Sequence, residues 1–273
     1  MMSHKRPLEF YGHNVESTQD WNTVLTSQHC PYLDRRCVKQ RKSDPQQTIG
    51  ACILGFKQRR LIVCPHRFLQ RNQTFLDVVP LLSGGERFFV VPEIPMPGGN
   101  VDYFVVAERD GAIVDFAGLE IQSLDTTGSG GIWAAREALS AGELGIKYGY
   151  GINWKMSAKT ILMQLHHKVG SFEALAKKLV LVTQTEFFDY ITREFQSDHI
   201  HSAASHDAMH FHLYNCVPLN YEYQIILSTR QSTDARGIER ILSLGRPPEI
   251  SEGEVIARIR AKMPNALRLT LDS

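Results

Sequence analysis

Two apolar stretches joined by a short polar turn restrict the fold of this chain more than any other feature. They lie in "NVDYFVVAERDGAIVDFAGLEIQS", residues 100–123, where "ERDG" marks the turn. Valine, isoleucine, phenylalanine and tyrosine on both sides of a turn with glycine predict a β-hairpin within a sheet. The hairpin also carries Asp102, Glu120 and Gln122. It therefore places two carboxyl groups and an amide where apolar side chains are usual.

The spacing across the turn gathers these polar residues. We expect a three-residue loop, 109–111, so that Asp102 lies opposite Gly118 and Glu120 follows two residues later on the same face. A two-residue loop would reverse the face of Glu120 unless a β-bulge intervened, for which Ala117–Gly118 is the natural position. Both arrangements bring the polar side chains together on one side of the hairpin.

Such a cluster favours a divalent cation. Two neighbouring carboxylates repel each other unless a cation lies between them, and Mg²⁺ binds through one or two carboxylates together with substrate phosphate. A bound Mg²⁺ can activate water toward a phosphodiester. Glu93, in the strand expected at 85–96, is a further acidic candidate. The alternative is a solvent-exposed polar face on an edge hairpin, with Glu93 facing solvent.

Four of the five cysteines fall in one basic segment and suggest a metal site. Four thiolates suit a closed tetrahedral site, and iron and zinc both accept them. The N-terminus lacks the apolar run of a signal peptide and no stretch is apolar enough to span a membrane, so we expect a cytoplasmic protein with no membrane partner. Disulfides are disfavoured there, although the spacing also allows four unrelated buried cysteines. The four are Cys30, Cys37, Cys52 and Cys64.

Charge is unevenly distributed along the chain. Residues 1–72 hold 12 Lys+Arg and 5 Asp+Glu, whereas residues 73–143 hold 3 and 11. This asymmetry predicts a polyanion-binding N-terminal segment and a cation site in the middle, unless the charges are only solvated faces. Candidate contacts to a nucleic-acid backbone are Arg35, Arg36, Lys39 and Arg41 in the cysteine segment, and Lys155 and Lys159 on one face of the helix expected after the hairpin.

The remaining patterns predict an α/β (α+β) fold with a mixed sheet flanked by helices. Further strands are expected at 178–184, 209–219 and 221–231, and helices at 130–142, 152–178, 187–195, 235–243 and 252–262. A histidine-rich segment could form a second metal site, a set of donors to bases and phosphates, or the centre of a metal-dependent enzyme, although ordinary histidines without a metal are the favoured explanation. Its members are His199, His201, His206, His210 and His212.

Taken together, these motifs resemble the NotI-type restriction endonucleases. "PGGNVDYFVV" followed by "GLEIQ" is similar to the PD-(D/E)XK nuclease signature, with glutamine replacing the usual lysine. "CPYLDRRCVKQRK", "IGACILG", "LIVCPHRF" and "GINWKMSAKTILMQ" extend the likeness from about residue 25 to at least residue 190. The resemblance implies a Mg²⁺-dependent type II site-specific deoxyribonuclease with Asp102 and Glu120 as Mg²⁺ ligands, Gln122 in the third motif position and a structural iron on the four cysteines.

The same resemblance implies partners and a domain plan. It suggests a homodimer that cuts both strands of a GC-rich palindrome in double-stranded DNA, paired with a cognate DNA methyltransferase. Residues 1–72 would form the cysteine module and 73–273 the nuclease domain, with its core at about 85–190 and a C-terminal part for dimerisation or DNA recognition. A non-catalytic, metal-stapled DNA-binding protein is the alternative. Because an amide carries no charge, Gln122 could only hydrogen-bond and orient.

Overall fold

The structure is a computed structural model that describes residues 5–17, 19–41, 44–243 and 251–262, without the side chains of Arg41, Asp44 and Lys262. The side chain of Arg41, a predicted DNA contact, therefore lies outside the described part of the chain. Residues 1–242 form one compact unit, and residues 243–273 form a second, of which helix α7 (Glu252–Lys262) is described. The expected boundary at residue 72 stays a prediction.

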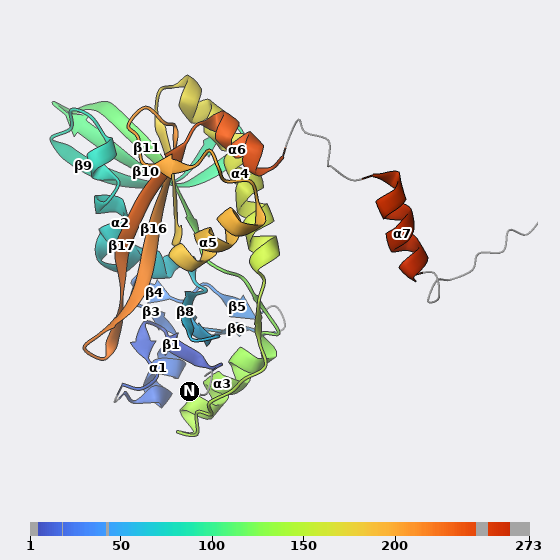
Figure 1. The fold of residues 1–273 in the computed structure, drawn as a ribbon. Coiled ribbons are helices and arrows are strands. Elements are labelled where there is room, and N and C mark those ends of the chain that lie inside the picture. The colour runs from blue at the N-terminus through green and yellow to red at the C-terminus, as the bar shows by residue number, and fades with distance from the viewer. Residues whose placement is uncertain (1–4, 18, 42–43, 244–250, 263–273) are drawn as a thin grey trace, which may run out of the picture. The chain divides into compact units, whose positions relative to one another are not determined.

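A seven-stranded mixed sheet forms the centre of the compact unit (Figure 1), with the order β15-β17-β16-β14-β11-β10-β9. The three inner strands β11, β14 and β16 are parallel, and the other pairs are antiparallel. The predicted α/β (α+β) class is confirmed at this level. The strands are β9 (Arg87–Met96), β10 (Gly99–Arg109), β11 (Ala112–Gln122), β14 (Lys178–Gln184), β15 (His201–Ser202), β16 (Met209–Leu219) and β17 (Glu222–Thr233).

Side chains that alternate along the strands point to opposite faces of this sheet, and both faces are buried. Phe104 and Leu181 pack into one core with the long helices, whereas Val105 and Val182 pack into a second core with the short helices that follow Cys64. The elements of the first side are α4 (Trp154–Ala174), α5 (Thr185–Glu194) and α6 (Ala235–Ile241). Those of the second are the 3₁₀ helices η1 (Pro65–Asn72) and η2 (Val79–Leu81), and α2 (Gln73–Leu76).

The N-terminal part contains a four-stranded sheet, β2-β1-β7-β8, for which we predicted no elements. Its strands have two to six residues, too few to show a clear period of two. They are β1 (Pro7–Phe10), β2 (His13–Asn14), β7 (Ala51–Phe56) and β8 (Arg59–Ile62). Around them lie α1 (Trp21–Ser27), α3 (Gly130–Ser140) and the short pairs β3 (His29–Cys30) with β4 (Arg35–Arg36), β5 (Gln40–Arg41) with β6 (Asp44–Thr48), and β12 (Thr126–Thr127) with β13 (Gly151–Ile152).

A buried ion pair fixes η1 to the N-terminal sheet. Arg67 Nε lies 2.8 Å from Glu9 Oε1, and both side chains are almost fully buried. The Tyr32 hydroxyl donates to the same carboxylate, and its ring lies against the Arg67 guanidinium. Arg67 also donates to the carbonyl of Tyr223 on β17. Because each charge has a close partner and further hydrogen bonds, this pair ties the start of η1 to three distant segments.

The β10–β11 turn is one residue shorter than we predicted. Arg109 pairs with Ala112, so the loop is Asp110–Gly111, and both residues have positive φ. Two-residue loops of this kind match the twist of the strands, and an Asp-Gly pair suits them. The expectation of a three-residue loop was therefore wrong.

A β-bulge returns Glu120 to the same face of the hairpin as Asp102. The bulge lies at a different place from the one expected. The register shifts between Ala107 and Glu108, beside the turn, rather than at Ala117–Gly118. Gly118 is needed for packing, since a Cβ there would lie 2.4 Å from the ring of Phe172 on α4. With Tyr103 opposite Leu119, Asp102 directly opposes Glu120 instead of Gly118.

The turn between β9 and β10 touches helix α4. Gly98 has a φ of +93°, and a Cβ there would lie 2.2 Å from the main-chain oxygen of His167. Gly99 follows with a φ of +120° and faces the Lys168 side chain. Glycine is favoured at both positions by the backbone conformation, and at Gly98 it is also required by the close approach of the helix. No helix in the described part of the chain is long and apolar enough to cross a membrane.

Candidate active site

Asp102 and Glu120 face each other across β10 and β11 at the centre of the predicted site. The backbone N–H of Ile121 donates to Asp102 Oδ2 over 2.9 Å, and the backbone N–H of Asp102 hydrogen-bonds to the Glu120 carboxylate. Only 3% of Glu120 is exposed, and Asp102 is half-buried. The hairpin register thus holds two carboxylates side by side in a largely dry position.

The two carboxylates destabilise each other's charge. Burial, reinforced by repulsion from Asp102, raises the pKa of Glu120 to about 7. Burial also raises the pKa of Asp102, and Glu93 acts in the same direction. A divalent cation between the carboxylates would relieve this repulsion, and Mg²⁺ needs only one or two of them. The residues present therefore fit the predicted cation.

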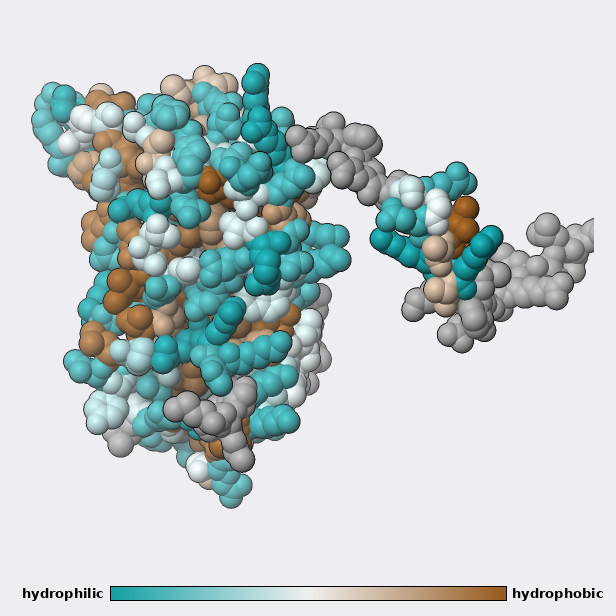
Figure 2. All heavy atoms as spheres, in the orientation of Figure 1, coloured by the Kyte–Doolittle hydropathy of each residue, from teal (hydrophilic) through white to brown (hydrophobic). Residues whose placement is uncertain are grey.

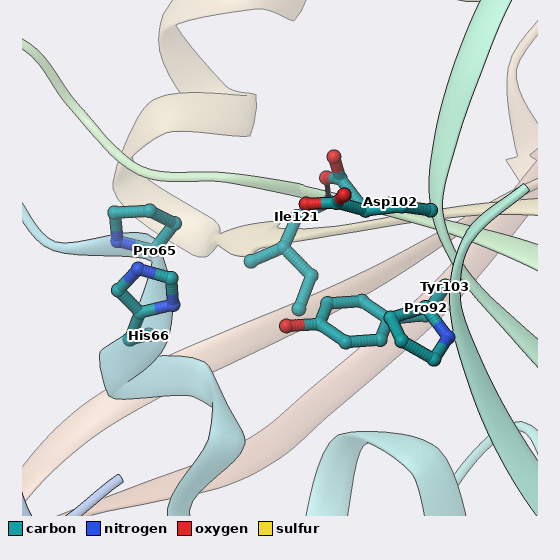
Figure 3. Close-up of a pocket in the computed structure, with 7 residues that line it drawn as sticks. Pro65, His66, Pro92, Asp102, Tyr103 and Ile121 are labelled. Atoms are coloured by element: carbon teal, nitrogen blue, oxygen red, sulfur yellow. Dashed lines mark hydrogen bonds between the residues drawn. The ribbon is translucent and has the colours of Figure 1, made fainter. Parts of the chain in front are cut away.

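A pocket of about 220 Å³ opens beside Asp102 (Figure 3). His66 enters it from the start of η1, and in Figure 3 its imidazole and the Tyr103 hydroxyl point into the same space. Burial, with help from the charge of Arg35, lowers the pKa of His66, so its neutral form is favoured. The lining residues are Pro65, His66, Pro92, Glu93, Asp102, Tyr103 and Ile121. The pocket is thus lined both by residues that directly follow Cys64 and by the carboxylates of Glu93 and Asp102.

Glu93 and Gln122 lie near the pair in different ways. Glu93 occupies the register position of β9 opposite Asp102 and lines the pocket, with an exposed side chain. Its φ of +53° is unusual for a residue other than glycine, especially within a strand. Gln122 shares the face of Glu120 by strand alternation, and its amide donates to the carbonyl of Ser123 over 2.5 Å.

A lysine that we did not predict reaches the carboxylates. Lys168 Nζ on α4 lies 2.6 Å from Glu120 Oε1, and only 4% of the residue is exposed. The predicted DNA contacts Lys155 and Lys159 are exposed on the same helix, about 20 and about 14 Å from Lys168 along its axis. Lys168 stands at helical spacing from the buried residues Leu165 and Phe172. The sequence did contain a signal for this contact, namely a lysine on the apolar face of a predicted helix.

The four cysteines of the N-terminal segment are buried and free. Cys30 and Cys64 each precede a proline, and each receives hydrogen bonds from the two backbone amides that follow that proline. Amides directed at sulfur stabilise a thiolate. A hydrogen bond with Cys52 lowers the pKa of Cys64 to about 7, and the charge of Lys39 acts in the same direction. The repeated "CP" turn is thus suited to thiolate ligands.

The arrangement of the thiols is more open than a closed metal site. Cys30 is near enough to Cys64 and Cys37 for their charges to affect its pKa, and Cys52 contacts Cys64. Among the residues that the structure describes, no three His, Cys, Asp or Glu side chains are grouped closely enough to hold a metal ion. The donor chemistry fits four thiolate ligands, and a metal there stays a prediction.

The basic residues of the cysteine segment lie close to the pocket. Arg35 and Arg36 are exposed on β4. The charge of Arg35 acts to lower the pKa of both His66 and Tyr103. Arg36 donates to the carbonyl of Gln46. Lys39 Nζ donates to the carbonyl of Val63 over 2.8 Å. Of these side chains, Arg35 acts on both His66 and Tyr103, and Lys39 acts on His66.

The predicted histidine cluster divides into buried and exposed members. His201 and His206 are exposed, and each has Nε2 3.4 Å from the buried carboxylate of Asp207. His210 and His212 lie inside the sheet on β16, and burial lowers the pKa of both. His199 has a buried Nε2 without a hydrogen-bond partner. The described residues include no metal-binding group here, so the second metal site gains no support.

Comparison with known proteins identifies one family that the chain matches. The family model described as "Restriction endonuclease NotI" matches residues 28–216, which is more than half of the chain. The matched segment contains all four clustered cysteines, the carboxylate pair and Lys168. No curated protein matches the chain.

The buried histidine His212 should make stability depend on pH. Burial and the nearby charge of Arg230 lower its pKa to about 3, from 6.5 in the unfolded chain. The unfolded state therefore binds the proton more tightly, so this contribution to the free energy of unfolding is complete above pH 6.5 and decreases toward pH 3. The expected slope is at most about 1.4 kcal/mol per pH unit.

Urea unfolding of the wild type and of His212→Leu across the mildly acidic range measures this contribution. The substitution removes the titrating group, so the variant should lose less stability than the wild type for each unit of acidification. Parallel pH profiles for the two proteins would contradict the assignment.

Proposed function

The chain belongs to the NotI family of restriction endonucleases, and we propose that it is a type II enzyme that hydrolyses double-stranded DNA with Mg²⁺ at a palindromic, GC-rich site. Membership of the family makes it a site-specific deoxyribonuclease. The metal, the form of the DNA site and the residue roles are parts of the proposal.

The observation that carries the proposal is the carboxylate pair. Asp102 and Glu120 stand opposite each other beside a pocket, and their mutual repulsion favours a divalent cation. A merely structural hairpin would gain nothing from two such groups, because burial of carboxylates costs stability unless a cation compensates. We assign both residues as Mg²⁺ ligands, with Glu93 as a further acidic contributor.

Each remaining group has a role that its chemistry permits. In hydrolysis the water oxygen bonds to phosphorus, the bond from phosphorus to the leaving oxygen breaks, and the proton lost by water is balanced by one taken up at the leaving oxygen. A bound Mg²⁺ would supply Lewis acidity at the phosphate and acidify the water. Gln122 would orient the water by hydrogen bonding, and His66 and Tyr103 would donate to phosphate oxygens.

The cysteine segment would support the same site by positioning residues beside the pocket and by binding the DNA backbone. Cys30, Cys37, Cys52 and Cys64 would hold a structural ion, for which iron is favoured over zinc by family resemblance alone. The segment runs through Cys64 and Pro65 directly to His66, and it presents Arg35 near the pocket. Arg35, Arg36, Lys39, Arg41, Lys155 and Lys159 would contact the DNA backbone.

An exposed strand supports a dimer. β9 is an edge strand of the central sheet, and its exposed apolar side chains are Phe88, Phe89, Val90 and Val91. Hydrophobic atoms gather at the upper left of Figure 2, where Figure 1 places β9. A long apolar edge is a site for pairing with another chain, and twofold symmetry matches a palindrome. A cognate methyltransferase would protect the host DNA, and a cytoplasmic location stays a prediction.

Replacement of Glu120 by Gln should abolish cleavage while DNA binding survives. The amide keeps the size of the side chain but is a poorer Mg²⁺ ligand, so we expect the cleavage rate in Mg²⁺ to fall at least about 100-fold. Gel cleavage assays and a mobility-shift assay measure the two activities. Asp115→Asn on the same strand is the matched control, since Asp115 pairs with Lys177 away from the site.

If Glu120→Gln cut DNA at the wild-type rate, the carboxylate pair would have no catalytic role. Intact DNA with the wild type in Mg²⁺, together with a mobility shift, would instead identify a non-catalytic DNA-binding protein.

The purified protein should contain about one iron or zinc per chain, held by the four cysteines. Cys64→Ser should lose this metal, because Cys64 contacts Cys52 and lies near Cys30. Elemental analysis checks both statements, with Cys216→Ser as a control for a buried cysteine outside the cluster. Wild-type protein without a transition metal would remove the structural ion from the account.

A further inference from the structure

We propose that Lys168 is a positioning residue of the active site, which holds Glu120 and supplies the positive charge that Gln122 cannot. This inference rests on the proposed nuclease function. It assigns a role to a helix residue outside the hairpin motif, and it explains how a site with an amide in the third motif position keeps a fixed cation beside its carboxylates.

The contacts of Lys168 are those of a fixed group. Its Nζ donates to Glu120 Oε1 over 2.6 Å and to the main-chain oxygen of Asn100 over 2.6 Å. The same Glu120 carboxylate also receives the backbone N–H of Asp102. Hydrogen bonds between charged groups at this distance are strong and directional. Glu120 is therefore held from both sides, with one carboxylate oxygen committed to the ammonium.

The surrounding backbone is shaped to admit this lysine. The β9–β10 turn contains two successive glycines with positive φ, and α4 approaches it so closely that Gly98 has no space for a Cβ. Gly99 lies against the Lys168 side chain, at 3.7 Å from its Cε to the position of a Cβ. Asn100 then presents its carbonyl to the ammonium. Three consecutive residues of the "PGGN" motif thus contact the segment that delivers Lys168.

The place of the Lys168–Glu120 pair, more than its burial, favours a role in the site, since the equally buried Arg67–Glu9 pair that anchors η1 contains no proposed Mg²⁺ ligand. An ion pair as buried as Lys168 and Glu120 gains little net stability, because both charges lose their hydration, and apolar residues would serve packing better. Strand β11 carries a comparison, Asp115 paired with Lys177, in which both side chains are more exposed. That surface pair lies outside the pocket, whereas the Lys168 pair involves a proposed Mg²⁺ ligand.

The test compares Lys168→Met with the wild type and with Lys177→Met. The wild type must first cleave DNA in Mg²⁺, since failure there would overturn the proposed nuclease function and this inference with it. We expect Lys168→Met to lower the single-turnover cleavage rate at saturating Mg²⁺ at least about 100-fold, with DNA binding retained. Lys177→Met should cleave at the wild-type rate.

Mg²⁺ binding without DNA, measured by calorimetry, gives a second readout. Removal of an ammonium beside the carboxylates should tighten Mg²⁺ binding several-fold, because like charges no longer compete for the same carboxylates. A lysine that serves only structure would produce no such combination of tighter metal binding and slower cleavage. Unchanged cleavage by Lys168→Met, or weaker Mg²⁺ binding, would overturn the role.

Relocation of the lysine completes the experiment. The double variant Gln122→Lys/Lys168→Met places an ammonium two residues from Glu120 on the same strand face and should recover at least about a tenth of the wild-type rate. If Lys168→Met fails to fold, this variant decides alone, and cleavage by it supports the inference. A folded double variant without cleavage, or failure of both variants to fold, would reduce Lys168 to a structural residue.

Discussion

Two carboxylates that share a largely buried position are the constraint on which the rest of the site depends. Asp102 and Glu120 are neighbours because the β10–β11 register makes them so; burial, reinforced by the charge of Asp102, raises the pKa of Glu120, and burial raises that of Asp102. Such a pair is stable only where positive charge is provided. Lys168 provides it from α4, and the pocket beside Asp102 offers a place for a divalent cation.

The same constraint explains why distant segments meet here. Packing of α4 against the sheet requires Gly98 and Gly118, and this packing brings Lys168 to Glu120. From the other side, the buried Arg67–Glu9 pair anchors η1, whose first residues carry His66 into the pocket. Cys64 immediately precedes that segment. A metal at the cysteines would thus stabilise the segment that presents His66, which connects the N-terminal module to the chemistry.

Local patterns predicted the long elements well because those elements bury regular faces. The hairpin strands, α4 and β14 all have enough residues for their apolar period to be clear. The strands of the N-terminal sheet are too short for that. Apart from the histidine cluster, the last 80 residues showed no functional signal, although they contribute β15, β16 and β17 to the central sheet. The pairing of β16 with β14 depends on contacts far apart in the sequence, which no local pattern contains.

The candidate site was predictable only in part for a related reason. Asp102 and Glu120 were identified because strand alternation fixes their face, yet the preferred loop length and the expected position of the bulge were wrong. Gly118 stays in the ladder beneath Phe172, and the bulge lies beside the turn instead. Lys168 and His66 were missed because tertiary packing, not motif spacing, brings them to the carboxylates.

Digestion of unmethylated genomic DNA by the purified protein, in Mg²⁺ and in EDTA, tests the central claim most directly. The account predicts discrete fragments in Mg²⁺ alone, with fragment ends that share one palindromic sequence. Intact DNA in Mg²⁺, or fragments that persist in EDTA, would contradict a Mg²⁺-dependent nuclease centred on Asp102 and Glu120.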